Sequence, residues 1–337
     1  MAWPVVARSF SILTEPDMMT QSLRVGVIGV GHLGRHHARI YQGLPMVSLA
    51  GVVDIDPSRG TSIAQEVGIP YFENLTDLLP VVDAVSVAVP TSAHYSVVRA
   101  CLTHDCHVLV EKPITSHVWE GEELVELARS KRKILHVGHI ERFNPIIECV
   151  RPLIQNPGFI ECHRLSPFQP RGTDVDVVRD LMIHDIDLLL SLGLGPIKEV
   201  EARGLPVFTA YPDIANVRIL FESGCLANLT ASRISTGRLR KIRLYQRDRY
   251  ISIDFGVKEA VIHTRKMVDG DTIDVDCQNL KGGKGDSLTR ELECFIQSIL
   301  GSNLHQGVSG EEGVEALRVA TQVGSLIQQH IDSLSSS

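Results

Sequence analysis

The sequence lacks the marks of a membrane-anchored or disulfide-bonded protein. No apolar run in its 337 residues approaches the ~18 residues that a membrane helix needs. Its seven cysteines include no C-x-x-C pair, and their odd number and wide scatter are typical of reduced thiols in the cytoplasm. We therefore expect a cytoplasmic protein that does not contact a membrane.

Basic residues are scarce at the N-terminus and are outnumbered by acidic residues overall. The first 20 residues contain one basic residue, Arg8, which is a poor composition for a signal or transit peptide. We expect residues 1–21 to form a loose extension, with natural translation starting at Met18 or Met19. The formal net charge of −7 excludes a protein that binds nucleic acid through its overall charge. An anionic substrate would therefore need positively charged residues at its own binding site.

Size and composition indicate about two soluble globular domains. The chain is 44% hydrophobic and 22% charged, and its length suits two units of ordinary domain size. Over the first 145 residues, short apolar runs that indicate strands lie at 23–29, 48–54, 84–89, 107–110 and 133–137. Helical stretches fall between them at 58–67, 75–79, 93–104 and 118–131. This alternation predicts βαβ crossovers and a doubly wound parallel sheet, which is a Rossmann domain over residues 22–145.

The pattern changes after residue 145. Helices are expected at 145–154 and 178–193, and again at 286–300 and 310–332. Short strands separated by turn residues are expected at 215–221, 225–231, 240–246 and 249–254. Successive strands of this kind predict hairpins and an antiparallel sheet. We assign residues 146–337 to a second, α+β domain.

The segment Gly29-Val30-Gly31-His32-Leu33-Gly34 matches the G-x-G-x-x-G turn of dinucleotide-binding domains. The three glycines permit a tight turn, a close approach of the pyrophosphate and close helix packing, and the helix N-terminus offers N–H groups to phosphate. Asp54 follows the last glycine by 20 residues, at the end of the second strand. Its carboxylate would accept hydrogen bonds from ribose hydroxyls and repel a 2′-phosphate, which favours NAD over NADP. Alternatively, Asp54 only caps the turn at Asp56-Pro57, and nearby Arg59 complicates the choice.

Oxidation of an alcohol by hydride removal requires a base and a positive group beside the reacting carbon. Lys112 comes just after a predicted parallel strand, at the sheet edge where ligands bind in open α/β sheets, although a solvated surface lysine is the alternative. Asp180 and His184 are four residues apart on a predicted helix, so the carboxylate could orient the imidazole and raise its basicity. The alternatives are a helix cap with a solvated acidic face, or a metal site formed by His184, Asp185 and Asp187. We expect no metal, because no second His or Cys has matching spacing.

The glycine turn, Glu111-Lys112-Pro113 and the Asp180…His184 pair stand in an order that resembles the glucose–fructose oxidoreductase/inositol dehydrogenase/MocA family. The resemblance runs from Leu23 to about Ile331 and is strongest over 83–113. It implies a C-terminal domain with a large, mostly antiparallel open sheet that builds homodimer or homotetramer interfaces. It also implies that Lys112 lies near the reacting carbon and that His184, supported by Asp180, is the general acid/base.

The resemblance adds further cofactor contacts to those of the glycine turn. The residues expected to contact NAD are Gly29, Gly31, His32, Leu33, Gly34, Asp54, Arg59, Val89, Pro90, Thr91, His94, Glu111 and Lys112. Within the family, residues 138–145 and 180–187 are similar to bacterial UDP-N-acetylglucosamine 3-dehydrogenases. Those enzymes make a 3-keto sugar nucleotide, which an aminotransferase converts to a 3-amino sugar for lipid A and lipopolysaccharide. The resemblance therefore implies a UDP-sugar substrate and an aminotransferase as functional partner.

Arg164, Arg171 and Arg179 lie within 16 residues before the presumed catalytic helix, where a diphosphate would need positive charge. The alternative is that these arginines pair with acidic residues of the same segment, which are Asp174, Asp176 and Asp180. The residues expected to bind substrate are Lys112, Arg142, Asn144, Arg164, Arg171, Arg179, Asp180 and His184. Two other functions stay open: oxidation of a free sugar or polyol such as an inositol, and NAD sensing by a non-catalytic regulator. The presence of Lys112, Asp180 and His184 argues against the regulator.

Overall fold

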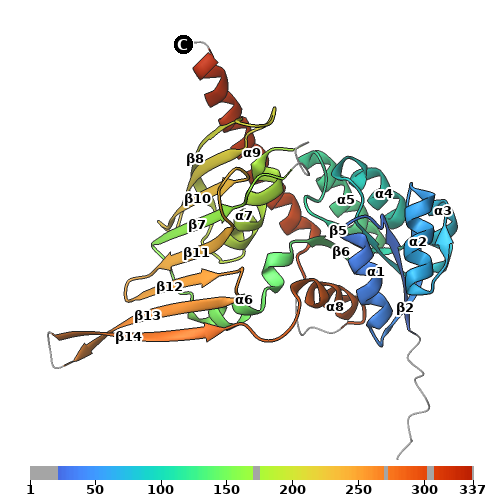
Figure 1. Ribbon diagram of the computed structural model, residues 1–337, viewed down its shortest axis with the longest axis horizontal. Helices are drawn as coiled ribbons and strands as arrows, with labels where there is room; N and C mark the ends of the chain where they lie inside the picture. The colour runs from blue at the N-terminus through green and yellow to red at the C-terminus, as the bar shows by residue number, and fades with distance from the viewer. Residues whose placement is uncertain (1–21, 170–174, 269–271, 302–306, 336–337) are drawn as a thin grey trace, which may run out of the picture.

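The computed structural model describes residues 22–169, 175–268, 272–301 and 307–335, which form two sheets with helices packed on them (Figure 1). The first sheet is parallel, with strand order β3-β2-β1-β4-β5-β6. Its strands are β1 (Leu23–Ile28), β2 (Val47–Val53), β3 (Tyr71–Phe72), β4 (Ala84–Val87), β5 (His107–Glu111) and β6 (Leu135–Gly138). This order is that of a doubly wound dinucleotide-binding domain. The predicted Rossmann domain is confirmed.

Helices cover both faces of this sheet, because its central strands are apolar on both sides. On one face, α4 (Thr91–Thr103) and α5 (Val118–Lys131) pack against Val85 and Val108. On the other face, α1 (Gly34–Gly43) and α2 (Pro57–Val67) pack against Val25 and Val27. The remaining short turns are α3 (Leu75–Leu78) and η1 (Leu79–Val81). Because the helices cover only the faces of the sheet, the carboxyl ends of its strands are left uncovered. These strand ends face the second sheet.

The second sheet has strand order β14-β13-β12-β11-β7-β10-β9-β8, and all its neighbours are antiparallel except β7 and β10. Its strands are β7 (Phe159–Leu165), β8 (Ile197–Leu205), β9 (Ile214–Phe221), β10 (Leu226–Ser232), β11 (Leu239–Tyr245), β12 (Arg249–Asp254), β13 (Glu259–Val268) and β14 (Thr272–Lys281). The prediction of a mostly antiparallel second sheet is confirmed. Strand β7 was not predicted, because the inward position of Arg164 interrupts its apolar alternation of Ile160 and Cys162.

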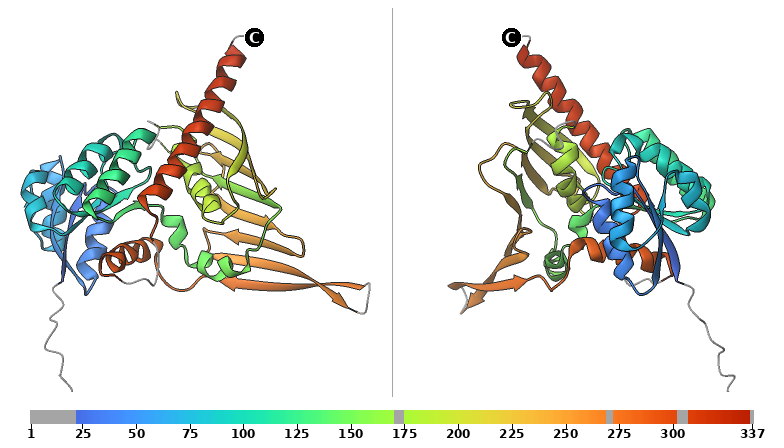
Figure 2. Two further views of the ribbon diagram at one scale, coloured as in Figure 1. Left: turned by 180° about the vertical axis from the view of Figure 1, so that it is seen from behind. Right: turned by 45° about the vertical axis from the view of Figure 1, so that its right-hand side comes forward.

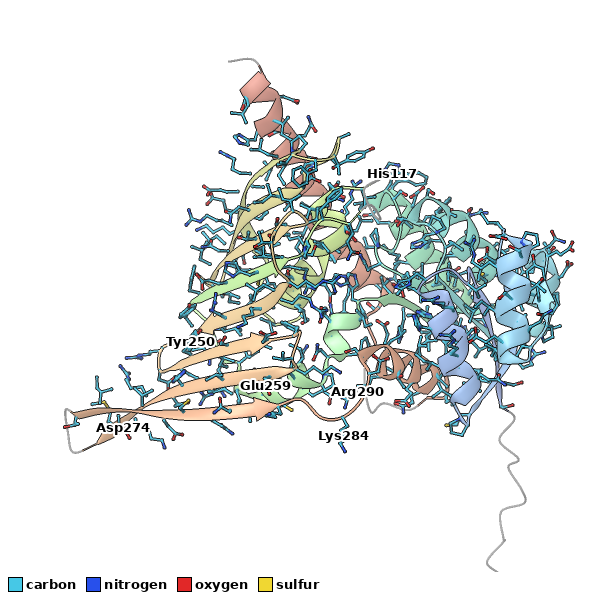
Figure 3. All side chains as sticks on the ribbon, viewed as in Figure 1. His117, Tyr250, Glu259, Asp274, Lys284 and Arg290 are labelled. Atoms are coloured by element: carbon cyan, nitrogen blue, oxygen red, sulfur yellow. The ribbon has the colours of Figure 1, made fainter. Side chains whose placement is uncertain are left out.

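One face of the second sheet is covered and the other is open. The helical elements on the covered face are α6 (Pro145–Val150), η3 (Arg151–Leu153), η4 (Val178–Met182), α7 (Ile183–Leu190) and α9 (Gly310–Ser335). Helix α9 runs obliquely across the sheet, as the view from behind shows (Figure 2). Tyr250 lies on the strand β12, whose outer face no helix of the described chain covers (Figures 1 and 3). None of the described helices is both long and apolar enough to cross a membrane.

The C-terminal segment does not stay within the second unit. Helix α8 (Ser287–Ile299) packs Leu292 and Phe295 into the core beneath the first sheet, beside Tyr41 of α1. Val314 of α9 packs on the opposite face of the same sheet. The simple division at residue 145 therefore does not describe the packing, because residues after 286 help to build the N-terminal core and join the two units.

Candidate active site

The glycine turn after β1 has the shape that a bound pyrophosphate requires. Gly29 has φ = +83°, and a Cβ on it would lie 2.8 Å from the carbonyl oxygen of Ala88. A Cβ on Gly34 would lie 1.8 Å from the oxygen of Gly29, so helix and turn meet without space for a side chain. A Cβ on Gly31 would meet nothing within 4 Å. Gly31 therefore borders open space at the start of α1, whose N-terminus no side chain caps in the described structure. The turn fits a dinucleotide.

Asp54 lies where β2 ends, but its carboxylate already has partners within the protein. It accepts hydrogen bonds from the N–H groups of Val30 (2.8 Å) and Asp56 (2.9 Å) and from Nε (3.0 Å) and Nη2 (2.7 Å) of Arg59. Burial raises the pKa of Asp54, but these hydrogen bonds outweigh burial and lower it below the usual value. The carboxylate is therefore ionised beside the glycine turn, and a ribose would share it with Arg59. In the structure, Arg59 therefore forms an ion pair with Asp54.

A cleft of about 440 Å³ runs from the glycine turn to the second unit. The predicted residues that line it are Leu33, Val89, Pro90, Thr91, His94, Glu111, Lys112, Arg179 and Asp180. His94 is 1% exposed and holds its ring nitrogens 3.0 Å and 2.8 Å from the carbonyl oxygens of Val89 and Pro113. His94 therefore connects the segment at Val89 with the segment at Pro113, and both segments line the cleft. The carboxylate of Glu111 turns instead to His37, 3.1 Å away, while His32 at the turn is exposed.

Lys112 follows β5 and reaches across the cleft to the second unit. Its Nζ donates to the carbonyl oxygen of Asp180 at 2.7 Å and lies 3.3 Å from the Asp180 carboxylate. The lysine side chain is 17% exposed, so its charge is available in the cleft rather than fully solvated. The contact joins residues 68 positions apart and places a cation at the carboxyl edge of the parallel sheet.

The structure corrects the predicted pairing of Asp180 with His184. The expected helix begins with η4, a π-helical turn, and only then continues as α7. This wider turn changes the i, i+4 alignment of an α-helix, and Asp180 contacts Lys112 instead. His184 is partly buried, and its Nδ1 is buried without a hydrogen-bond partner among the described residues.

Burial lowers the pKa of His184 well below its usual value, and nearby positive charge lowers it further. The charged or chargeable groups that act in this direction are Lys112, Arg164, His139 and Arg240. His184 is therefore a neutral imidazole near pH 7. It can accept a proton, which is the property that a general base requires.

Two predicted substrate arginines are engaged inside the protein. Arg164 is 5% exposed and forms a bidentate pair with Asp185 (3.0 and 2.7 Å) and a further bond to Glu141 (2.8 Å). Arg142 binds Asp187 through two nitrogens (2.7 and 2.6 Å) and Glu312 through the third (2.6 Å). Both guanidinium groups therefore bind carboxylates of the protein, whereas Arg164 was expected to face a diphosphate and Arg142 to bind substrate.

These pairs also occupy the carboxylates considered for a metal site. Asp185 and Asp187 point to Arg164 and Arg142, and no group of three metal-ligating side chains occurs among the described residues. Asn144 caps α6 by accepting from the N–H of Ile146 at 3.3 Å and is 4% exposed. Its contact with substrate stays a prediction.

The other two substrate arginines differ in position. Arg179 lines the cleft beside Asp180, and its nearest carboxylate contact is Asp176 at 3.9 Å with the side chain about a third exposed. Of the predicted substrate arginines that the structure describes, Arg179 has the longest carboxylate contact and lines the cleft. Arg171 lies outside the described residues.

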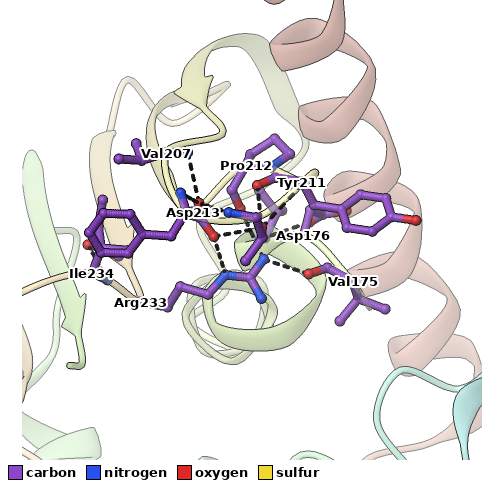
Figure 4. Close-up of polar contacts among 12 residues, drawn as sticks. Val175, Asp176, Val207, Tyr211, Pro212, Asp213, Arg233 and Ile234 are labelled. Carbon is purple, nitrogen blue, oxygen red and sulfur yellow. Dashed lines mark hydrogen bonds and ion pairs between the residues drawn. The ribbon is translucent and has the colours of Figure 1, made fainter. Parts of the chain in front are cut away.

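A second ion pair fixes the wall of the cleft at Val175 (Figure 4). Buried Asp213 accepts the N–H groups of Val207, Phe208 and a third loop residue, and it contacts Arg233 Nε at 3.1 Å. Arg233 in turn donates to the carbonyl oxygen of Val175. This ion pair was not predicted, because Asp213 directly precedes β9 and Arg233 directly follows β10, so the two residues show no local spacing signal.

The comparisons with known proteins agree with this geometry. Residues 23–139 match the NAD-binding Rossmann-fold model of an oxidoreductase family, and residues 163–251 match the GFO/IDH/MocA C-terminal domain. A UDP-N-acetylglucosamine 3-dehydrogenase from Acidithiobacillus ferrooxidans is 36% identical over 320 residues, which is 91% of this chain and 99% of the relative. The chain belongs to the GFO/IDH/MocA oxidoreductase family.

Two inositol dehydrogenases of this family are less similar to the chain than the Acidithiobacillus enzyme is. A solved structure of the Acidithiobacillus enzyme superimposes with a TM-score of 0.85 and covers 92% of this chain and 99% of that one. A myo-inositol 2-dehydrogenase from Thermotoga maritima is 26% identical over 88% of this chain and 93% of the relative. A scyllo-inositol dehydrogenase from Lactobacillus casei, solved with NAD(H), has a TM-score of 0.75 at 19% identity, covers 92% of this chain and 98% of that one, and shows the shared fold. This chain is an NAD-binding oxidoreductase.

Proposed function

We propose that the protein oxidises the 3-hydroxyl of UDP-N-acetylglucosamine to the 3-keto sugar nucleotide with NAD. The observation that carries this proposal is similarity over almost the whole of both chains to a UDP-N-acetylglucosamine 3-dehydrogenase. The cleft supports it, because Lys112 lies within it beside Asp180, close to the neutral imidazole of His184. A dehydrogenase of a free polyol would use the same two groups but would need no site for a diphosphate.

The proposed chemistry assigns one task to each side chain. NAD, when bound, supplies the hydride acceptor. His184 accepts the hydroxyl proton, since it enters the reaction neutral. Lys112 places its ammonium beside the same oxygen and stabilises the negative charge that develops there. Asp180 fixes the lysine through its carbonyl and carboxylate oxygens, so the ammonium does not have to be reoriented during the reaction.

The diphosphate would bind near Arg179, with Arg171 as the further candidate. Arg179 borders the cleft at the same edge as Asp180 and is exposed enough to meet a ligand. A guanidinium can donate two parallel hydrogen bonds to phosphate oxygens. The buried arginines Arg142 and Arg164 would shape the site through their carboxylate pairs instead.

The chemistry of the proposed 3-keto product indicates which reaction would follow. A 3-keto sugar nucleotide is a substrate for an aminotransferase, and we propose that such an enzyme consumes it in the cytoplasm to form a 3-amino sugar for lipid A. We also propose that the protein is a homodimer or homotetramer joined through the open sheet face. A row of aromatic rings crosses four neighbouring strands there, with centroid distances of 5.5, 5.1 and 5.8 Å along Phe159, Tyr245, Tyr250 and His263.

The direct test is NADH formation by the purified protein with UDP-N-acetylglucosamine, UDP-glucose and myo-inositol in parallel. We expect near-ultraviolet absorbance of NADH to rise with UDP-N-acetylglucosamine and a product lighter by two hydrogens in the mass spectrum. Reduction of the product with borodeuteride places the label at the oxidised carbon. His184→Ala serves as the matched control for contaminating dehydrogenases. Turnover of myo-inositol without turnover of the UDP-sugar would assign the protein to polyols.

A further inference from the structure

A second cavity adjoins the cleft at Arg179. It has a volume of about 250 Å³ and lies between η4, the loop that joins β8 to β9, and helix α9. Arg179 lines both this cavity and the cleft, so the two spaces meet at this residue. Pockets that hold a whole small molecule usually measure about 300–1,000 Å³. The size of the second cavity therefore suits one part of a larger ligand whose other part lies in the cleft.

The helix that forms one wall of the cavity contains a glycine that leaves space open. Gly324 lies in the middle of α9 and lines the cavity, and a Cβ on it would meet nothing within 4 Å. Gly313 on the same helix differs, because a Cβ there would lie 2.4 Å from the side chain of Val137. Glycine is among the least favourable residues for a helix interior. Close packing explains Gly313, whereas space for a ligand would explain Gly324.

The loop between β8 and β9 presents an aromatic ring to the same cavity. Tyr211 lines the cavity and is 47% exposed, and its ring extends from the loop toward α9 (Figure 4). The next residue, Pro212, is held in place, since its carbonyl oxygen accepts the N–H of Val177 at 3.0 Å and Nη2 of Arg233 at 3.1 Å. The ring is therefore carried by a fixed backbone, and an exposed ring of this kind can stack on a flat ligand ring.

The polar groups of the cavity complement a nucleoside. The carboxamide of Gln328 carries donors and an acceptor, as the edge of a nucleobase requires, and one of its N–H groups binds Asp332 at 2.8 Å. Ser325 adds a hydroxyl. Asp176, whose Oδ1 accepts the N–H groups at the start of η4, offers a carboxylate to ribose hydroxyls. A carboxylate repels phosphate, so the anionic part of a ligand belongs at Arg179 and a neutral part belongs in the cavity.

We propose that this cavity binds the nucleoside of the sugar nucleotide, with the base against Tyr211 and the diphosphate at Arg179. This inference rests on the proposed function. A sugar nucleotide consists of sugar, diphosphate and nucleoside in that order. The chain offers the cleft with Lys112, then Arg179, then the second cavity in the same order. A free polyol would leave the cavity unused.

Two substitutions test the two walls of the cavity. Gly324→Leu fills the cavity from a position where the Cβ meets no described atom, and leucine favours a helix. Tyr211→Ala removes the stacking ring, and Tyr211→Phe retains it. We expect Gly324→Leu and Tyr211→Ala each to weaken binding of UDP by roughly tenfold to a hundredfold, with Kd for NAD unchanged. KM for UDP-N-acetylglucosamine should rise by a similar factor while kcat stays near that of wild type, because the nucleoside is remote from the reacting carbon.

Matched controls come from the same chain. Gly43→Leu adds the same side chain at another helical glycine, the last residue of α1, whose Cβ position is equally open. Phe208→Ala removes an exposed aromatic ring from the same loop as Tyr211, and Phe208 is not among the described residues that line either cavity. Both control variants and Tyr211→Phe should bind UDP as wild type does.

Calorimetry of the complex with NAD, titrated with UDP and with inorganic diphosphate, isolates the contribution of the nucleoside. We expect wild type to bind UDP more tightly than diphosphate, and Gly324→Leu and Tyr211→Ala to lose most of that difference. This result would assign the cavity even if UDP-N-acetylglucosamine is not oxidised, in which case only the proposed reaction fails. Equal affinities of wild type for UDP and diphosphate, or a preference for UDP that both variants retain in full, would overturn the proposal.

Discussion

Lys112 lines the cleft, His184 lies in the second unit within electrostatic reach of Lys112, and each has a distinct electrostatic environment. Lys112 is anchored by two oxygens of Asp180, which keep its ammonium oriented. His184 lies among positive groups and is partly buried, so it stays neutral and able to accept a proton. One residue thus stabilises negative charge while the other accepts the proton, and neither belongs to the glycine turn.

Removal of either side chain should affect turnover and spare cofactor binding. We expect His184→Ala and Lys112→Ala each to lower kcat by about 10²–10⁴-fold, the usual contribution of a general base or its partner. NAD affinity, measured by calorimetry, should stay within a few-fold of wild type. The double variant should be little worse than the poorer single variant, because groups acting as a unit are not additive. Near-normal turnover in His184→Ala would require another base.

The pH dependence should report the lowered pKa of His184. The active form is the neutral imidazole, so kcat rises with pH as the proton leaves. Since burial and nearby cations hold the pKa well below the usual ~6.5, activity should already be at its plateau at pH 6.5 and fall only in more acidic buffer. Single-turnover rates from acid to neutral pH measure this limb. A midpoint at or above pH ~6.5 would contradict the electrostatic description of the site.

At the scale of elements, two of the three glycines between β1 and the start of α1 have different physical roles. Gly34 permits contact between parts of the protein, since a Cβ there would penetrate the oxygen of Gly29. Gly31 borders open space, so its role concerns what enters that space. Gly34 therefore allows the turn and the helix to pack closely, while Gly31 leaves room for a ligand.

Matched alanine substitutions should separate these roles. Gly31→Ala should keep the thermal midpoint of wild type and weaken NAD, because the added methyl group projects into the proposed pyrophosphate site. Gly34→Ala should lower the free energy of unfolding by about 1–3 kcal/mol through overpacking against backbone. Differential scanning fluorimetry with and without NAD measures both effects. Unchanged NAD affinity in Gly31→Ala would place the pyrophosphate elsewhere.

At the scale of the whole molecule, α8, which packs onto the first sheet, carries a buried acid. Glu291 is 2% exposed, and neither carboxylate oxygen has a hydrogen-bond partner among the described residues. Burial, followed by the negative charge of Glu111, raises the pKa of Glu291 well above its usual value. The folded protein therefore favours the protonated side chain, while the unfolded chain ionises it readily.

The consequence is a loss of stability as pH rises. Because the folded pKa is raised, the stabilising protonated form is fully present below the unfolded value of ~4.3 and is progressively opposed above it. Glu291→Gln should therefore unfold at a higher temperature than wild type near pH 8, and the difference should shrink as the pH falls toward ~4.3. Glu293→Gln, on the same helix but partly exposed, is the control. A pH-independent difference between Glu291→Gln and wild type would point to packing instead of ionisation.

We expect the protein to assemble through the open face of the second sheet. Tyr250→Asp would place a charge in the centre of the aromatic row and should yield a smaller species in size-exclusion chromatography with light scattering. Tyr211→Asp, in an exposed loop between β8 and β9, should leave the mass unchanged. Equal masses for wild type and Tyr250→Asp would remove this face from the interface.

Much of the fold and part of the site could be predicted because their signals are local. The alternation of apolar runs and helical stretches predicted the parallel sheet, and strand ends placed Lys112 and Asp54 at its free edge. Family resemblance added the cleft residues after β4. The packing of α8 onto the first sheet could not be predicted in this way, because an apolar helix face indicates burial but not which sheet the helix packs against.

The sequence by itself determined the chemistry available: a dinucleotide turn, a lysine at a strand end and a histidine on a helix. Tertiary structure decided which charges meet. It paired Asp180 with Lys112 instead of His184, and it enclosed Arg164 with Asp185 and Glu141. The physical reason is that an ion pair depends on distance and burial in space, and neither quantity can be read from spacing along the chain.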